Sequence, residues 1–140
     1  ASEESERRLA KASARLVYTF ANATVPKVNV IAGKAYGSAG VVMNSKSVGA
    51  DMVYAWPDAE IGMMDAELAA KIMYADETAQ VQREKAEEYK NLQSSPVSAA
   101  RRGYVDTLIQ PENTRKYVIG AFEMLATKRE ERPFKKHGTV

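Results

Sequence analysis

The residues best suited to do chemistry form a run of small side chains, Gly37, Ser38, Ala39 and Gly40, after a β-branched stretch that begins at Val28. Glycine permits a backbone conformation closed to other residues and lets a ligand approach closely. The N–H groups of the residues that follow are the unpaired donors of a helix start, and such donors can hold a negatively charged oxygen. Placed about 3 Å from an enolate oxygen, a pair of them would stabilise a transition state by a few kcal/mol.

Spacing alone favours a different interpretation of this turn. Small residues between a strand and a helix more often serve close packing of the two elements. The Met63-Met64 pair likewise fits ordinary packing. Taken without further information, the turn is therefore interpreted as a tightly packed corner.

Composition limits the other kinds of chemistry. The chain has one histidine and no cysteine, which excludes a disulfide, a thiol nucleophile and a cysteine-ligated zinc, and we expect no metal site. Its 20 basic and 18 acidic residues are interspersed and leave a net charge of +2, so we expect no nucleic-acid partner. The apolar runs are far shorter than the ~20 residues of a membrane span, and no signal peptide is evident, so a cytoplasmic protein is expected.

Strands and helices are predicted to alternate around the turn. Apolar residues at three-and-four spacing predict a first helix over residues 4–23. β-Branched or alternating patterns predict strands over residues 26–32, 52–56 and 60–64. Residues 33–43 are expected to form a turn that enters a short helix, and Asp65 is a candidate N-cap for a helix over residues 66–74.

The second half continues the alternation. The polar segment 76–92 predicts a projecting or loosely packed helix, and Pro96 and Gly103 bound a short helix. A strand is expected over residues 104–109, and Pro111 opens the last helix. The apolar stripe of that helix is predicted to contain Val118, Ala121, Phe122 and Leu125.

This order of elements predicts an α/β fold, but three or four short strands make an incomplete sheet. A helix that begins almost at residue 1 has no preceding strand to pack on. We therefore expect a partial domain that needs a neighbour. The long apolar stripes of the first and last helices lead to the same expectation of a partner or of self-association.

Five sequence segments, in a fixed order, resemble the carboxyltransferase subunits of biotin-dependent acyl-CoA carboxylases and decarboxylases. These are Ala23-Thr-Val-Pro-Lys-Val, Lys34-Ala-Tyr-Gly-Ser-Ala, Asp51-Met-Val-Tyr-Ala-Trp-Pro-Asp-Ala-Glu-Ile-Gly-Met-Met, Ala99-Ala-Arg-Arg-Gly-Tyr-Val-Asp and Lys135-Lys-His-Gly. They cover nearly the whole chain. The resemblance implies a crotonase-like (ClpP/crotonase) β-β-α spiral, with residues 1–140 as the C-terminal part of the biotin-side domain.

The resemblance also implies partners and cofactors. In the family an N-terminal domain receives the acyl-CoA, and biotin arrives on a biotin carboxyl carrier protein. The substrate would be a short acyl-CoA, propionyl-CoA and methylmalonyl-CoA among the candidates. A chain without the acyl-CoA domain is expected to be inactive alone and to work in a homo- or hetero-oligomer.

The resemblance assigns site residues by position. The backbone N–H groups of Ser38 and Ala39 correspond to the oxyanion hole that holds the biotin enolate, with no side-chain acid or base needed. Tyr36, Gly37, Gly40 and Val41 are then candidates for binding biotin or substrate, and Val41 could face the acyl group. Ser38 departs from the family, which usually has a second glycine there.

Two other functions stay open at this stage. One is a crotonase-like acyl-CoA enzyme without biotin, because that fold also places oxyanion-holding amides at such a turn. The other is a noncatalytic assembly fragment in which the end helices make subunit contacts. Carboxylation, decarboxylation and transcarboxylation share this half-site, so the sequence does not choose among them.

Overall fold

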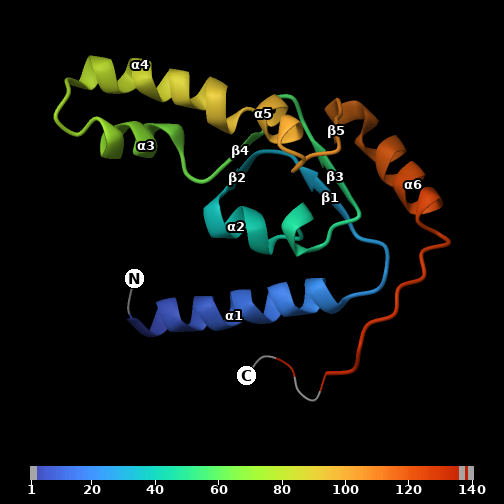
Figure 1. Cartoon of the computed structure of the whole chain (residues 1–140). Helices are drawn as coiled ribbons and strands as arrows, with labels where there is room; N and C mark the ends of the chain where they lie inside the picture. The colour runs from blue at the N-terminus through green and yellow to red at the C-terminus, as the bar shows by residue number, and fades with distance from the viewer. Residues whose placement is uncertain (1–2, 136–137, 139–140) are drawn as a thin grey trace.

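The computed structural model of the chain describes residues 3–135 and residue 138 and contains two parallel sheets (Figure 1). The first sheet has the order β1-β3-β5, and its strands are β1 (Val28–Ile31), β3 (Met52–Ala55) and β5 (Thr107–Leu108). The second sheet pairs β2 (Lys34–Tyr36) with β4 (Glu60–Gly62). Lys136 and His137 of the last family segment lie outside the described residues.

The chain passes twice through the same sequence of elements. A strand of the first sheet leads by a short link into a strand of the second sheet, and a helix follows: β1, β2 and α2, then β3, β4 and α3. The two passes pair in parallel, with Val28 opposite Met52 and Lys34 opposite Glu60. This repetition is the β-β-α spiral of a crotonase-like fold, and it is only part of a domain.

Helices surround the two sheets. They are α1 (Glu3–Asn22), α2 (Gly37–Val42), α3 (Ala66–Met73), α4 (Ala79–Tyr89), α5 (Pro96–Arg101) and α6 (Thr114–Met124). Two 3-10 turns (Lys46–Val48 and Pro111–Asn113) and a π-helical segment (Lys90–Ser94) complete the elements of the described residues. None of the helices in this part of the chain is long and apolar enough to cross a membrane.

The sequence signals for helix starts are confirmed at two positions. Asp65 caps α3 by accepting a hydrogen bond of 3.0 Å from the backbone N–H of Glu67. Pro96 occupies the first turn of α5, where Ser95 accepts from the N–H of Ser98 at 3.2 Å. Both caps satisfy donors that have no partner inside the helix.

The buried core lies around the three-stranded sheet. On one face Val53 and Ala55 are 1% and 0% exposed, and they pack with buried side chains from neighbouring segments: Ala50, Ala59, Ala99 and Val105. On the other face Tyr54 packs with Ile109 and Ala121, so α6 covers this face. The ring of Tyr54 also meets that of Tyr117 edge to face at 5.5 Å.

The structure corrects three local expectations. Residues 34–36 form a strand and not part of a turn, because they pair with β4. The strand expected over residues 104–109 is reduced to Thr107–Leu108, the only residues there that pair with β3. Phe122 is 46% exposed, since Ala121 takes the inward position of α6.

A partly buried ion pair links distant parts of the chain. The ammonium of Lys128, after α6, lies 2.9 Å from both carboxylate oxygens of Asp51, just before β3. Asp51 also accepts a hydrogen bond from the backbone N–H of Lys27 at 2.7 Å. The Lys27 ammonium in turn donates to the carbonyl of Phe20 in α1. These bonds link the end of α1, the entry to β3 and the segment that follows α6.

The projecting helix expected from the polar segment 76–92 is present. Figure 1 shows α3 and α4 as an antiparallel hairpin that extends away from the sheets. The two helices pack on each other through small side chains, Ala66, Ala70 and Ala86, with Tyr89 beside them. α3 also exposes two large apolar side chains, Leu68 and Ile72.

Candidate functional site

The turn between β2 and α2 leaves little room for side chains at two positions. Gly37 has φ +54°, and a Cβ added there would lie 3.0 Å from the carbonyl oxygen of Met63. A Cβ at Gly40 would lie 3.0 Å from the carbonyl carbon of Ala35. Glycine is therefore favoured at Gly37 by the backbone conformation and the limited space, and at Gly40 by the close contact of α2 with β2.

The start of α2 offers backbone donors and no capping side chain. Its N-cap is Tyr36, an extended residue whose side chain makes no capping hydrogen bond. Ser38 and Ala39, in the first turn, are exposed. Among the described residues only Asn44 combines a positive φ with a side chain, so Ser38 sits in an ordinary conformation. Ser38 can therefore keep its N–H group at the start of α2 without backbone strain.

The side chain of Tyr36 turns toward the second sheet. Its hydroxyl donates a hydrogen bond to Glu60, which also lies 2.9 Å from the ammonium of Lys90. Burial, together with this hydrogen bond to a carboxylate, raises the pKa of Tyr36 above its ordinary value of 10.0. The same bond from Tyr36, with help from Lys90, holds the pKa of Glu60 below its ordinary value of 4.5. Tyr36 therefore stays protonated and acts as a donor.

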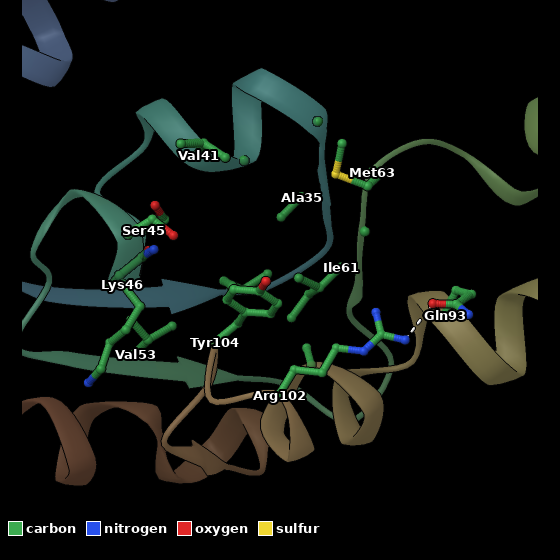
Figure 2. Close-up of a pocket in the computed structure, with 17 residues that line it drawn as sticks. Ala35, Val41, Ser45, Lys46, Val53, Ile61, Met63, Gln93, Arg102 and Tyr104 are labelled. Carbon is green, nitrogen blue, oxygen red and sulfur yellow. Dashed lines mark hydrogen bonds between the residues drawn. The ribbon is translucent and has the colours of Figure 1, made fainter.

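A cavity of about 240 Å³ lies beneath α2, between the two sheets (Figure 2). Its floor is apolar and is formed by side chains of both sheets, Ile31, Val53 and Ile61. Gly37, Gly40 and Val41 line the side formed by α2. A cavity bounded by small and aliphatic residues suits a small apolar or flat group.

Polar side chains gather on the opposite rim of the cavity. Figure 2 shows Tyr104 and Arg102 rising from the segment around α5 toward Ile61. The Arg102 guanidinium donates to the side-chain oxygen of Gln93. The buried hydroxyl of Ser45, which also lines the cavity, has no hydrogen-bond partner in the structure. The rim can therefore offer hydrogen bonds to a ligand.

The six residues assigned from the sequence divide into two groups. Gly37, Gly40 and Val41 border the cavity, and Val41 is 45% exposed. Ser38, Ala39 and Tyr36 do not line it: the first two face outward at the start of α2, and the hydroxyl of Tyr36 is engaged by Glu60. The residues that carry the backbone donors therefore lie next to the cavity at this turn but do not line it.

Sequence reasoning missed several residues of the site. Met63, which was interpreted as packing, is 79% exposed, and its carbonyl borders Gly37. Gln93, Arg102 and Tyr104 reach the cavity from a segment more than 50 positions after Gly37. Only the family segment that begins at Ala99 pointed to this region. No local pattern marked Gln93.

The turn between β2 and α2 combines backbone donors with small residues. No group of three or more His, Cys, Asp or Glu residues in the described part of the chain could hold a metal ion. Tyr36 is hydrogen-bonded to a carboxylate, which disfavours loss of its proton. What the turn can do chemically is stabilise negative charge on an oxygen by N–H donation.

Residues 2–140 match the family described as Carboxyl transferase domain. The methylmalonyl-CoA decarboxylase subunit alpha of Propionigenium modestum is 45% identical over 133 residues, which are 91% of this chain and 26% of that protein. The propionyl-CoA carboxylase beta chain of Saccharopolyspora erythraea is 45% identical over 137 residues, 91% of this chain and 25% of that protein. The chain thus spans about a quarter of the length of these relatives.

A solved structure of the transcarboxylase 12S hexamer, with hydrolysed methylmalonyl-coenzyme A bound, superimposes with a TM-score of 0.91 at 42% identity. The superposition covers 99% of this chain and 27% of that one. Fold, order of elements and sequence therefore agree over the same residues.

Proposed function

The chain belongs to the carboxyl transferase domain family, and from this premise we propose that it forms the biotin-side part of an acyl-CoA carboxyltransferase. Residues 1–140 would be the C-terminal part of the domain that receives biotin. The complete enzyme would move a carboxyl group between carboxybiotin and a short acyl-CoA. Among the proteins that the chain resembles are a propionyl-CoA carboxylase chain and a methylmalonyl-CoA decarboxylase subunit, which supports this substrate class and leaves the direction of transfer open.

One observation carries the proposal: the start of α2 presents amides that no side chain caps or covers. A side chain at Gly37 or Gly40 would crowd the carbonyl of Met63 or the backbone of Ala35. Ser38 and Ala39 between them are exposed. An acceptor brought to this turn would find N–H groups that no N-cap side chain occupies.

These residues fit the ureido group of biotin, which is small, planar and ends in a carbonyl oxygen. Biotin supplies the transferable carboxyl group when its carrier protein delivers it. The amides of Ser38 and Ala39 would hold the carbonyl oxygen and stabilise the negative charge that develops there. Gly37 would allow close approach of the group, and Gly40 and Val41 would bound the neighbouring cavity. Tyr36 would fix the entry to the helix.

The same proposal names partners. A separate N-terminal carboxyltransferase domain would hold the acyl-CoA, and a biotin carboxyl carrier protein would bring biotin. The structurally similar transcarboxylase 12S is a hexamer, which supports an oligomeric enzyme here as well. Catalysis by positioning is lost when one reactant is not held, so we expect the 140-residue chain to show no steady carboxyl transfer by itself.

The decisive test is Ala39→Pro in the enzyme assembled with its acyl-CoA domain and biotinylated carrier. Proline removes one N–H donor, and in the first turn of a helix that N–H has no partner within the helix to lose. We expect carboxyl transfer to fall at least about 100-fold, the usual effect of losing an oxyanion donor. Circular dichroism and the oligomeric state should be unchanged.

Ser38→Ala is the matched control because it keeps the amide and removes only the hydroxyl. We expect it to retain activity. Wild-type turnover by a folded Ala39→Pro enzyme would show that the turn is only a packed corner. A large loss in Ser38→Ala would assign the function to the hydroxyl and not to the backbone.

A further inference from the structure

Glu60 is the centre of a polar cluster on the second sheet, apart from the amides of α2. Its side chain is only 16% exposed, yet it meets three donors. The Tyr36 hydroxyl donates to Oε2, the Lys90 ammonium lies 2.9 Å from Oε1, and the Lys34 ammonium lies 3.9 Å from Oε2. A carboxylate with this many partners holds its geometry well.

The cluster sits where β2 ends and α2 begins. Tyr36 is both the last residue of β2 and the N-cap of α2. Glu60 is the first residue of β4 and pairs with Lys34, two positions before Tyr36. The bond between Tyr36 and Glu60 therefore crosses the sheet diagonally and anchors the residue that immediately precedes the turn.

Gly37 makes such an anchor necessary. A glycine moves easily between backbone conformations, so its φ of +54° must be held by its neighbours. Tyr36, the residue before Gly37, is hydrogen-bonded to Glu60. A shift of Tyr36 would change the conformation of Gly37 and with it the direction of the amides that follow.

We infer that Glu60 is a positioning residue: through Tyr36 it sets the direction of the Ser38 and Ala39 amides. This inference rests on the proposed function of those amides. Glu60 itself touches no substrate and transfers no proton. The directions of the two pKa shifts agree with this role. The lowered pKa of Glu60 keeps it ionised as an acceptor around neutral pH, and the raised pKa of Tyr36 keeps it protonated as a donor.

Lys90 extends the cluster to the helical hairpin. It follows α4 directly and begins the π-helical segment Lys90–Ser94. Its contact with Glu60 therefore joins the base of the hairpin to the entry of α2. On the exposed side of α4, Lys85 and Glu88 form an ion pair at 2.8 Å that provides a matched control.

The test compares four variants in the assembled enzyme. Tyr36→Phe removes the donor and keeps the ring. Glu60→Leu removes the acceptor, and Glu60→Gln keeps an acceptor oxygen of nearly the same shape. Glu88→Gln makes the same carboxylate-to-amide change on the exposed pair. The measurements are kcat, KM for the acyl-CoA, thermal melting, and the amide proton resonances of Ser38 and Ala39 in the isolated chain.

We expect kcat to fall about tenfold in Tyr36→Phe and Glu60→Leu with KM unchanged, the pattern of an interaction used only in the transition state. Glu60→Gln should recover most of the activity, and Glu88→Gln should match the wild type. The Ser38 and Ala39 resonances should move in the first two variants only. Melting temperature alone would fall if the cluster were merely structural.

The variants distinguish failure of the inference from failure of the proposed function. If Tyr36→Phe and Glu60→Leu keep wild-type kcat while Ala39→Pro is inactive, the amides work without this anchor and the proposed function stands. If Ala39→Pro is also fully active, the proposed function is wrong. The amide resonances then decide on positioning: a shift specific to Tyr36→Phe and Glu60→Leu supports it, and unchanged resonances refute it.

Discussion

The two sheets of this chain are built in different ways. In the three-stranded sheet, β3 contributes three consecutive buried residues, Val53, Tyr54 and Ala55, between two apolar clusters. In the two-stranded sheet no residue of β2 or β4 is buried. Its side chains interact through hydrogen bonds and ion pairs around Glu60. The first arrangement stabilises the fold by burial. The second adjoins the start of α2, where the proposed donors lie. We therefore expect stability and carboxyl transfer to depend on separate regions.

The largest effect is expected from a substitution that destabilises only the core around the three-stranded sheet. Ile109 is 2% exposed and packs against Tyr54 and Ala121. Ile109→Ala should lower the free energy of unfolding by roughly 3 kcal/mol, because a buried side chain is lost and a cavity remains. Urea titration followed by circular dichroism measures this. Ile109→Val should cost about 1 kcal/mol. Transfer activity per folded molecule should not change, and an equal loss of activity would contradict the separation.

Gly37→Ala should disturb the turn that follows the two-stranded sheet. An L-residue at φ +54° is strained by about 1–2 kcal/mol, and its Cβ would lie 3.0 Å from the Met63 carbonyl oxygen. The turn must shift, so we expect transfer to fall by about tenfold or more while the three-stranded sheet stays folded. Activity assays and circular dichroism of the assembled enzyme check this. Full activity would mean that the turn adapts without moving its amides.

The ion pair of Asp51 with Lys128 tests the comparison of the two sheets through the pH dependence of stability. Burial alone would raise the pKa of Asp51, but hydrogen bonds from Lys128 and the Lys27 backbone outweigh it and hold the pKa below its ordinary value of 3.8. The stabilisation is thus fully present above about pH 4. It is lost as the pH falls through the lower folded-state pKa.

Removing the Asp51 charge should therefore act on stability and not on the turn. Asp51→Asn should lower the free energy of unfolding by roughly 2 kcal/mol at neutral pH, the usual contribution of hydrogen bonds to a charged group. Its acid-side stability should depend less on pH than that of the wild type. Urea titrations between pH 3 and pH 7, on the order of half-unit steps, measure both effects. An unchanged pH profile would show that Asp51 is not the titrating group.

The smallest effect is expected at Ser38. Its side chain is exposed and its backbone is unstrained, so Ser38→Ala should change the free energy of unfolding by less than about 0.5 kcal/mol. Ser38→Gly should preserve transfer, because the amide remains, and slightly reduce stability through added freedom in the unfolded chain. Thermal melting measures the change in stability, and turnover measures the change in transfer activity. A rise in activity with glycine would indicate that the serine side chain obstructs the ligand.

The sequence predicted features that depend on local chemistry. Asp65 as a cap, Pro96 as a helix start and Gly37 at the turn were all confirmed, because each follows from the preferences of a few adjacent residues. The family segments added the spiral. β2 was missed because residues 34–36 become a strand only by pairing with residues 60–62.

The contacts between distant residues were out of reach for the same reason. Nothing near Lys128 indicates that its partner is Asp51, 77 positions earlier. The bond between Tyr36 and Glu60 spans 24 positions, and the cavity rim comes from a later segment. Such contacts require the three-dimensional path of the chain.

The conformation of Gly37 also has a consequence for handedness. Positive φ is the ordinary region of D-amino acids, and a D-alanine carries its methyl group on the opposite side of the Cα from an L-alanine. At this position D-alanine would relieve the dihedral strain and direct the methyl away from the place where an L-residue would meet the Met63 carbonyl. A chemically synthesised chain with D-alanine at position 37 would therefore show whether glycine is needed there for its freedom of rotation or for the space it leaves to a ligand.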